Sequence, residues 1–283
     1  MIVARSAADL HAAVSGPITF VPTMGALHEG HASLVRLAAA DGGAVVVSDF
    51  VNPTQFGPGE DFAAYPRDLD ADAEIAEAAG ADVLWAPSVD EIYPPGFATE
   101  VDPGPLALEL CGVSRPGHFV GVATVVTRLF GLVKPSRAIF GRKDSQQLVI
   151  LQQVARDHAL GLDVVGAPTM REGDGLAMSS RNQYLSAAER ERAAAVPRAL
   201  RAVASAYASG ERAAAALADV PLGDLDLEYL ELRSADLSAY DPDRPAVAMI
   251  ACRVGSTRLI DNVELDPVAP ASAGDALHAK EPA

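Results

Sequence analysis

Residues 18–51 read ITFVPTMGALHEGHASLVRLAAADGGAVVVSDFV, and this stretch decides the fold. Its first six residues, 18–23, have the composition of a strand, and 31–40 show the apolar spacing of a helix that the glycines at 42–43 close. Residues 44–51 form a valine-rich and nearly continuous apolar run, typical of a strand covered on both faces. A strand, a helix and a second strand in this order predict a parallel pair joined by a right-handed crossover.

The same alternation continues toward residue 167. It predicts, in chain order, helix 69–79, strand 82–86, helix 120–133, strand 137–140, helix 146–158 and strand 162–167. We therefore predict an α/β fold, a Rossmann-like parallel sheet with helices on both faces. The sequence shows no internal repeat.

The pattern changes after Pro168. A polar loop leads to Ser186, which forms a capping box with Glu189, and an Ala- and Arg-rich helix follows to about Ala208. Three strand-like runs come next, at 225–233, 246–254 and 257–265. They predict a smaller C-terminal α+β domain. We expect a Rossmann-like domain over residues 1–169, this α+β domain over 170–267, and a flexible tail over 268–283.

Composition excludes several classes of function. The chain has 283 residues, 49% of them apolar, and 22 Lys plus Arg against 38 Asp plus Glu give a net charge of −16. Such a charge repels phosphate backbones, so we expect no nucleic-acid partner. The first residues lack the apolar core of a secretory signal, and no stretch is long and apolar enough to span a membrane. Cys111 and Cys252 fit no metal spacing, so we expect buried thiols in a cytoplasmic protein.

Polar sequence follows each predicted strand of the parallel sheet. Ligands of such sheets bind beyond the carboxyl ends of the strands. The segments at these ends are TMGALHEGH, NPTQF, APSVDEIYP, GRKDSQQ and APTMRE, in chain order. Because these ends lie at one edge of the sheet, we expect the five segments to share one crevice.

His28-Glu29-Gly30-His31 is the sharpest signal among them, at the junction of a strand and a helix. A helix N-terminus attracts phosphate, and Gly30 would let a nucleotide approach the backbone closely. We expect the two imidazoles to face the same phosphate groups, because an imidazolium stabilises charge developing on a phosphate and its pKa suits proton transfer near neutral pH. The alternative is two surface histidines at a helix start. A zinc site lacks further ligands.

Lys143 and Asp144 stand between a short strand and a helix. The lysine could neutralise an α-phosphate, and Asp144 could accept ribose hydroxyls or only cap the helix. Gln146 and Gln147 open that helix. One of the two could bind a polar substrate group while the other is a solvated helix residue.

Three loops offer further polar groups. The Ser-Ser-Arg segment at 179–181 could grip triphosphate oxygens as a closing loop, or be an ordinary linker. Asn52 and Gln55 suit a hydroxy acid, or Asn52 only forms a structural turn. Residues 114–119 (SRPGHF) could reach the crevice, or only start a helix. The P-loop motif and the dinucleotide motif G-x-G-x-x-G are both absent.

Together these segments resemble one known family. PTMGALHEGH, FVNPTQF, YPR, EIYP, SRPGHF, KDSQQL and GLAMSSRN occur in this order between residues 18 and 265. This combination is similar to the pantothenate synthetase family (pantoate–β-alanine ligase). HEGH looks like the HIGH signature of the nucleotidylyltransferase and class I aminoacyl-tRNA synthetase superfamily, and the MSSR segment occupies the place of the KMSKS loop.

The resemblance implies an AMP-forming carbon–nitrogen ligase of pantothenate biosynthesis. ATP and pantoate would give pantoyl adenylate and pyrophosphate with Mg²⁺, and the amine of β-alanine would then attack the acyl carbon, giving pantothenate and AMP. The family implies a homodimer through the N-terminal domain and a C-terminal domain that covers the site. Mg²⁺ would be carried by ATP, with no protein ligand assigned.

The resemblance also implies residue roles. His31 would be the proton donor. His28, Lys143, Ser179 and Arg181 complete the catalytic set. The ATP site would comprise Met24, Gly25, His28, Gly30, His31, Gly141, Arg142, Lys143, Asp144, Met170, Met178, Ser179, Ser180 and Arg181. Pantoate and β-alanine would be bound by Gln55, Gln147, Asn52 and Met24.

Two residues depart from the family pattern. Arg142 stands where the family commonly has glutamate, and Asp49 stands where it commonly has isoleucine. A buried unpaired charge is costly, so we expect Asp49 to face a polar crevice or to pair with Arg142. Two other functions stay open. One is a related adenylate-forming ligase for a different acid or amine, and the other is a non-catalytic nucleotide-binding module.

Overall fold

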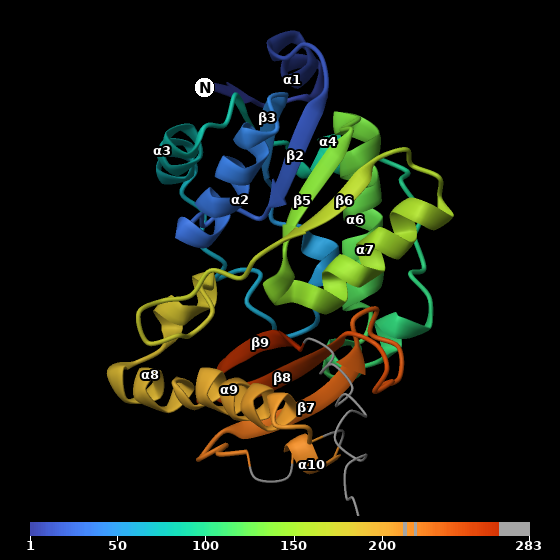
Figure 1. Cartoon of the computed structure of the whole chain (residues 1–283). Helices are drawn as coiled ribbons and strands as arrows, with labels where there is room; N and C mark the ends of the chain where they lie inside the picture. The colour runs from blue at the N-terminus through green and yellow to red at the C-terminus, as the bar shows by residue number, and fades with distance from the viewer. Residues whose placement is uncertain (212–213, 218–219, 266–283) are drawn as a thin grey trace, which may run out of the picture.

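Two sheets organise the protein, whose computed structural model describes residues 1–211, 214–217 and 220–265 (Figure 1). The first sheet has six strands and is parallel, and the second has three strands and is antiparallel. This confirms the predicted α/β class with a smaller C-terminal α+β part. The tail expected at 268–283 lies outside the described residues, and the domain boundary after residue 169 remains a prediction.

The parallel sheet has the order β1-β4-β3-β2-β5-β6. Its strands are β1 (Ile2–Ala4), β2 (Ile18–Thr23), β3 (Ala44–Asp49), β4 (Val83–Trp85), β5 (Arg137–Gly141) and β6 (Asp163–Ala167). The five predicted strands are all present, with ends that shift by at most two residues. Strand β1 was not predicted, because three residues are too few to show a periodicity. It pairs with β4 at the edge of the sheet.

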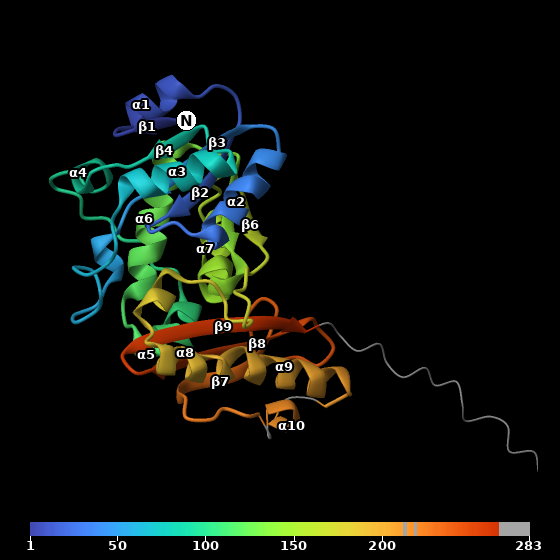
Figure 2. The same cartoon turned by 90° about the vertical axis from the view of Figure 1, so that its left-hand side faces the viewer.

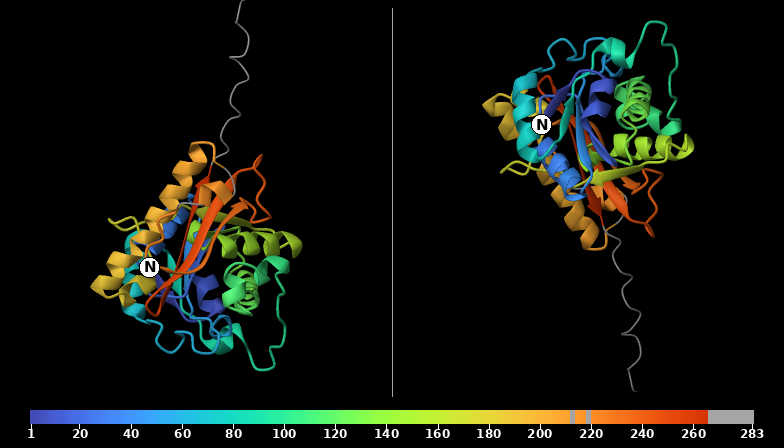
Figure 3. Two further views of the ribbon diagram at one scale, coloured as in Figure 1. Left: turned by 90° about the horizontal axis from the view of Figure 1, so that it is seen from below. Right: turned by 90° about the horizontal axis from the view of Figure 1, so that it is seen from above.

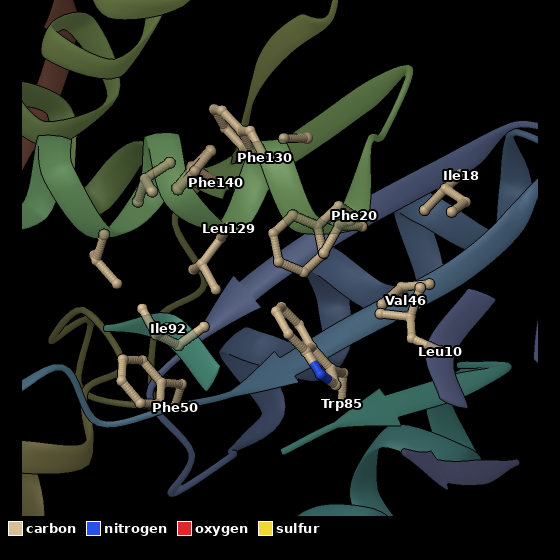
Figure 4. Close-up of a cluster of buried hydrophobic side chains, with 14 of the residues drawn as sticks. Leu10, Ile18, Phe20, Val46, Phe50, Trp85, Ile92, Leu129, Phe130 and Phe140 are labelled. Atoms are coloured by element: carbon tan, nitrogen blue, oxygen red, sulfur yellow. The ribbon is translucent and has the colours of Figure 1, made fainter. Parts of the chain in front are cut away.

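Helices cover both faces of this sheet, as predicted. One face carries α1 (Ala7–Ala13), α4 (Val89–Ile92), α6 (His118–Val133) and α7 (Ser145–Asp157), and the other carries α2 (Glu29–Ala40) and α3 (Leu69–Ala79). Alternation along β3 explains the two cores. Val46 packs with Phe20 and Trp85 on the α6 side (Figure 4), whereas Val45 and Val47 pack under α2 on the other.

The antiparallel sheet has the order β7-β8-β9. Its elements are β7 (Asp226–Ser234), β8 (Ala246–Val254), β9 (Thr257–Leu265), α8 (Ala187–Ala193), α9 (Ala195–Ala208) and α10 (Ala214–Leu217). Ser186 and Glu189 form the predicted capping box. The predicted single helix is interrupted at Ala194. Pro197 accounts for this break, because proline has no amide proton to donate to a carbonyl one turn earlier.

The second sheet lies below the carboxyl ends of the first, with α9 on its far side (Figures 2 and 3). Val247 and Met249 of β8 pack against Leu110, which belongs to the first part of the chain. Strand β9 contacts the segments after β5 and β6. The remaining short elements are η1 (Pro53–Gln55), η2 (Pro105–Leu108), α5 (Cys111–Ser114), η3 (Arg142–Asp144) and η4 (Ser180–Tyr184).

The cysteines and the helices bear on two expectations from composition. Both cysteines are free and buried, as predicted. None of the helices in the described part of the chain is long and apolar enough to cross a membrane.

An ion pair between a partly exposed arginine and a buried aspartate joins the segment after β6 to β9. Arg171 donates to both carboxylate oxygens of Asp261, at 2.6 and 3.0 Å, and the Asp261 side chain is only 1% exposed. Arg171 also donates to the Asn262 carbonyl oxygen at 3.1 Å. We therefore expect Arg171→Ala to lower the free energy of unfolding by about 3 kcal/mol, because Asp261 is left as an unpaired buried carboxylate.

Urea denaturation measures this change. Arg244→Ala is the matched control, because Arg244 pairs with Asp236 where both side chains are about half exposed. Its unfolding midpoint should stay at the parent value. Equal midpoints for the two variants would contradict the assignment of the Arg171–Asp261 pair as structural.

Candidate active site

A cavity of about 220 Å³ opens at the carboxyl ends of the parallel strands. Four of the five polar segments predicted to share a crevice line it: those after β2, β3, β5 and β6. The fifth, APSVDEIYP after β4, does not line it, so that part of the prediction is wrong. Its Tyr93 instead donates to Asn52 Oδ1 at 2.8 Å from outside the cavity.

Most of the predicted site residues meet at this cavity. They are Met24, His28, Gly30, His31, Asn52, Gln55, Gly141, Lys143, Asp144, Gln147, Met170, Met178, Ser179, Ser180 and Arg181. Gly25 and Arg142 do not line it. Gly25 forms the turn behind the cavity with a φ of +76°, and Arg142 points toward the second sheet.

The two histidines stack at the start of α2. His28 is the N-cap, its Nδ1 accepting from the Gly30 amide at 3.1 Å, and the ring centroids of His28 and His31 lie 4.1 Å apart. Burial, with Lys143 nearby, lowers the pKa of His28 to about 4. Burial, with His28 and Lys143 nearby, lowers the pKa of His31 to about 3. Both rings are therefore neutral near pH 7 in the free protein, so the expectation of a histidine pKa near neutrality does not hold there.

In the neutral state each ring has one nitrogen that can donate a hydrogen bond and one that can accept one. Because Nδ1 of His28 accepts a hydrogen bond, its proton is on Nε2, which can donate. The Nδ1 atom of His31 is buried without a partner among the described residues. A buried polar atom without a partner is costly, so a ligand that reaches His31 would be favoured.

Lys143 also lines the cavity, close enough to His28 and His31 to act on both rings. It has no ion pair in the part of the chain that the structure describes, and burial lowers the pKa of its ammonium group. Asn262 of β9 donates to the carbonyl oxygens of Arg142 and Lys143, at 2.9 and 2.8 Å, and so fixes this segment. Asp144 is the N-cap residue of α7 but makes no side-chain capping bond, so the capping alternative is wrong.

The segment 178–181 closes another wall of the cavity. The Arg181 guanidinium donates to both oxygens of Asp61, at 3.1 and 3.0 Å, and Ser180 forms a hydrogen bond with Tyr65. Ser179 Oγ accepts from the Arg181 amide at 3.3 Å. The segment is therefore packed on the loop after β3. An anion in the cavity has to compete with Asp61 for Arg181.

Asn52 and Gln55 have different parts in the site. The Asn52 amide is used within the protein: it donates to Gln55 Oε1 and to the Gly121 carbonyl, and it accepts from Thr54 and Tyr93. This supports the structural-turn alternative for Asn52. Gln55 Nε2 contacts the sulfur of Met24 at 3.1 Å, and the amide lines the cavity.

The adjacent residues Gln146 and Gln147 also have different environments. Gln146 is buried, accepts from the Cys111 amide and donates to the carbonyls of Leu106 and Glu109. It is a structural residue inside the protein, so the expectation that one of the two is solvated is wrong. Gln147 lines the cavity and makes no side-chain hydrogen bond in the described structure.

Several contributors were not identified from the sequence. The apolar wall of the cavity is one side of α6, with Val122, Val125, Val126 and Leu129, together with Phe50 and Phe140. The sequence shows these residues only as parts of an apolar helix and of strands, because a periodicity does not distinguish a cavity wall from a packed interior. Asp61 also carried no signal, since its partner Arg181 is 120 residues away.

His118 and Arg115 support the site from behind. His118 Nδ1 bonds the Gln55 carbonyl at 2.9 Å, and Arg115 pairs with Glu60 at 2.6 Å. Burial, with Arg115 nearby, lowers the pKa of His118 to about 4. The SRPGHF segment therefore fixes the loop that carries Gln55, in addition to starting α6.

The predicted pairing of Asp49 with Arg142 is wrong. Arg142 donates to the Gly166 carbonyl at 3.0 Å and pairs with Glu264 of β9, whereas Asp49 forms a hydrogen bond with Asp72. The strand order explains the separation. Asp49 ends β3 and Arg142 follows β5, and β2 lies between these strands.

No group of three or more His, Cys, Asp or Glu side chains in ranges 1–211, 214–217 and 220–265 could hold a metal ion.

Comparisons with known proteins agree on one family. Residues 3–264 match the family model described as pantoate-beta-alanine ligase. The pantothenate synthetase of Sphingopyxis alaskensis is 51% identical over 93% of this chain and 99% of its own length. The crystal structure of pantothenate synthetase from Thermus thermophilus is 46% identical, with a TM-score of 0.86 over 93% of this chain and 99% of that one.

A third relative was solved with ligands. It is the pantoate-beta-alanine ligase of Francisella tularensis, complexed with beta-gamma ATP and beta-alanine. It is 33% identical, with a TM-score of 0.78 over 93% of this chain and 97% of that one.

Because burial places the pKa values of His28 and His31 below the ordinary 6.5, we expect both rings to stay neutral down to about pH 5 in the free protein. The same histidines are protonated in the unfolded chain below pH 6.5, so the free energy of unfolding should fall as the pH falls from 6.5 toward 4. Proton–nitrogen correlation spectra of the histidine rings measure this directly, with exposed His158 as the reference for a solvated ring. A titration of either ring near pH 6.5 would refute the assignment.

Proposed function

The chain belongs to the pantoate-β-alanine ligase family, and on this premise we propose that it condenses pantoate with β-alanine through a pantoyl-adenylate intermediate. Family membership makes it an ATP-dependent ligase that forms pantothenate. The proposal adds the adenylate, the residue roles and Mg²⁺, which would enter with ATP because phosphate oxygens and water are its preferred ligands.

One observation carries the assignment of roles. The cavity is lined by Lys143 and the start of α2, and also by uncharged amides and an apolar wall. Lys143 and the start of α2 suit the phosphates of ATP, because an ammonium group without an ion pair and a helix N-terminus both attract anions. Gln55 and Gln147 suit the hydroxyl and carboxylate groups of pantoate, and Val122 and Val125 suit its two methyl groups.

In the first step, a pantoate carboxylate oxygen attacks the α-phosphorus of ATP. The new oxygen–phosphorus bond forms as the bond to the β-phosphate oxygen breaks, and pyrophosphate leaves. No protein nucleophile is needed, so the protein contributes position and charge stabilisation. Lys143 and the Nε2 proton of His28 would stabilise the negative charge on the phosphates, and His31 would donate to them once they occupy the cavity.

In the second step, the amine of β-alanine attacks the acyl carbon. The carbon–nitrogen bond forms, AMP leaves and the amine loses a proton. The adenylate has to be kept from water between the steps. Residues 178–181 line the cavity, and residues 257–260 of β9 line a second pocket that shares Lys143 and Ser179 with it, which supports the proposal that these segments exclude water. We also propose a homodimer through residues 1–169 and a cytoplasmic location, as the resemblance implies.

Pyrophosphate exchange into ATP tests the proposed function. We expect exchange that requires pantoate and Mg²⁺, and AMP release that further requires β-alanine. Exchange with another acid in place of pantoate would contradict the substrate assignment and favour a related adenylate-forming ligase. ATP binding without exchange under any of these conditions would contradict the proposal and favour a non-catalytic nucleotide-binding module.

Variants of the two neighbouring glutamines distinguish an effect on substrate binding from an effect on stability. We expect Gln147→Ala to raise the KM for pantoate by about tenfold, which corresponds to one lost hydrogen bond of about 1.4 kcal/mol, with an unchanged unfolding midpoint. Gln146→Ala should instead lower the free energy of unfolding by about 2 kcal/mol, because buried backbone groups lose their partners. Steady-state kinetics and urea denaturation of both variants make the comparison. The reverse pattern would exchange the two roles.

A further inference from the structure

The turn between β2 and α2 has an unusual backbone. Gly25 and Ala26 both have positive φ, +76° and +51°. Successive residues with positive φ point their backbone amides to the same side of the chain. A hydrogen-bond acceptor is then needed on that side. The Gly25 amide donates to Thr23 Oγ1 at 3.1 Å, and the amides of Ala26 and Leu27 donate to the two oxygens of Asp72, at 2.9 and 2.6 Å.

Asp72 is therefore the anchor of this turn. It lies on α3, is 2% exposed, and both of its oxygens accept from the turn. A second carboxyl group lies beside it, since Asp49 at the end of β3 forms a side-chain hydrogen bond with Asp72. Both groups pack against Gly25 so closely that a Cβ atom there would collide with an oxygen of each.

A hydrogen bond between two carboxyl groups needs a proton. The charged groups that act on Asp49 are Asp72 on α3, Arg5 after β1 and Arg67 before α3. Arg67 is already engaged with the carbonyls of Phe62 and Tyr65. Burial and Asp72 outweigh the two arginines and raise the pKa of Asp49 to about 7. Near neutral pH, Asp49 is thus in part a neutral donor.

We propose that Asp49 and Asp72 share one proton and act together as positioning residues for the ATP-binding turn. With the proton present, Asp49 donates to Asp72, whose oxygens remain aligned on the turn amides. With the proton lost, two negative carboxylates face each other in a buried place, and their repulsion loosens the turn that leads into His28 and Gly30. Apparent ATP affinity therefore falls as pH rises through 7. The functional half of this inference rests on the proposed ATP site.

ATP binding across pH tests the positioning role, using calorimetry on the full chain with Mg²⁺. If only the protonated pair holds the turn in its binding form, the dissociation constant of the parent protein rises by about three- to tenfold between pH 6 and 8. Asp49→Asn should abolish most of this rise, because its amide donates to Asp72 at every pH. Glu74→Gln changes an exposed residue of α3, the helix that carries Asp72, and should keep the parent pH profile of ATP binding.

The comparison between variants also removes the contribution of ATP itself. The terminal phosphate titrates near pH 6–7, but it does so equally with every variant. Parallel pH profiles for the parent and Asp49→Asn would overturn the positioning role. So would a loss of ATP affinity in Asp49→Asn at pH 6, where the parent is protonated. Restored affinity at pH 8 supports it.

Carbon-13 spectra of the aspartate carboxyl groups test the shared proton without ATP. In the parent protein we expect a carboxyl resonance that titrates near pH 7 and is absent from Asp49→Asn. If no aspartate titrates above pH 6, the shared proton is refuted whether or not the protein binds ATP. If the titration is seen but the ATP affinity does not change with it, the shared proton is supported and the positioning role is refuted.

Discussion

The turn from Thr23 to His28 has to leave the centre of a buried parallel sheet and begin a helix within a few residues. Its backbone amides lie where water has little access, so other protein groups have to accept their hydrogen bonds. Thr23 and Asp72 do this, and they set the direction of α2. The position of His28 and His31 in the cavity follows from how these few hydrogen bonds are made.

The second sheet acts on the same site from the other side. Asn262 of β9 holds the carbonyls of Arg142 and Lys143, and the adjacent Asp261 holds Arg171 on the segment after β6. Strand β9 thus fixes the backbone of two cavity walls, although it comes last in the described chain. This arrangement couples the packing of the C-terminal part to the placement of Lys143 in the cavity.

The electrostatics of the site differ from those of the whole protein. The net charge is −16, yet the cavity presents Lys143, Arg181 and two neutral histidines to a ligand. Arg181 is neutralised by Asp61, and burial disfavours the charged form of Lys143. A bound polyphosphate would reverse both conditions, because it supplies negative charge to the ammonium and competes with Asp61. In the free protein the cavity therefore holds little unbalanced positive charge.

The sequence by itself determined the order of the strands and helices apart from β1 and the shortest helices, the division into two sheets, and four of the five segments that gather at the strand ends. It did so because apolar periodicity, glycine and capping residues act over a few neighbouring positions. Only the tertiary structure decided the partner of each polar group. Gln146 and Gln147 are adjacent and alike in sequence, yet one is internal and the other faces the cavity. Asp49 was expected to meet Arg142 and meets Asp72 instead, because strand order rather than chemistry sets which side chains are neighbours. The charge state of His28 and His31 was also beyond the sequence, since it depends on burial that the whole fold creates.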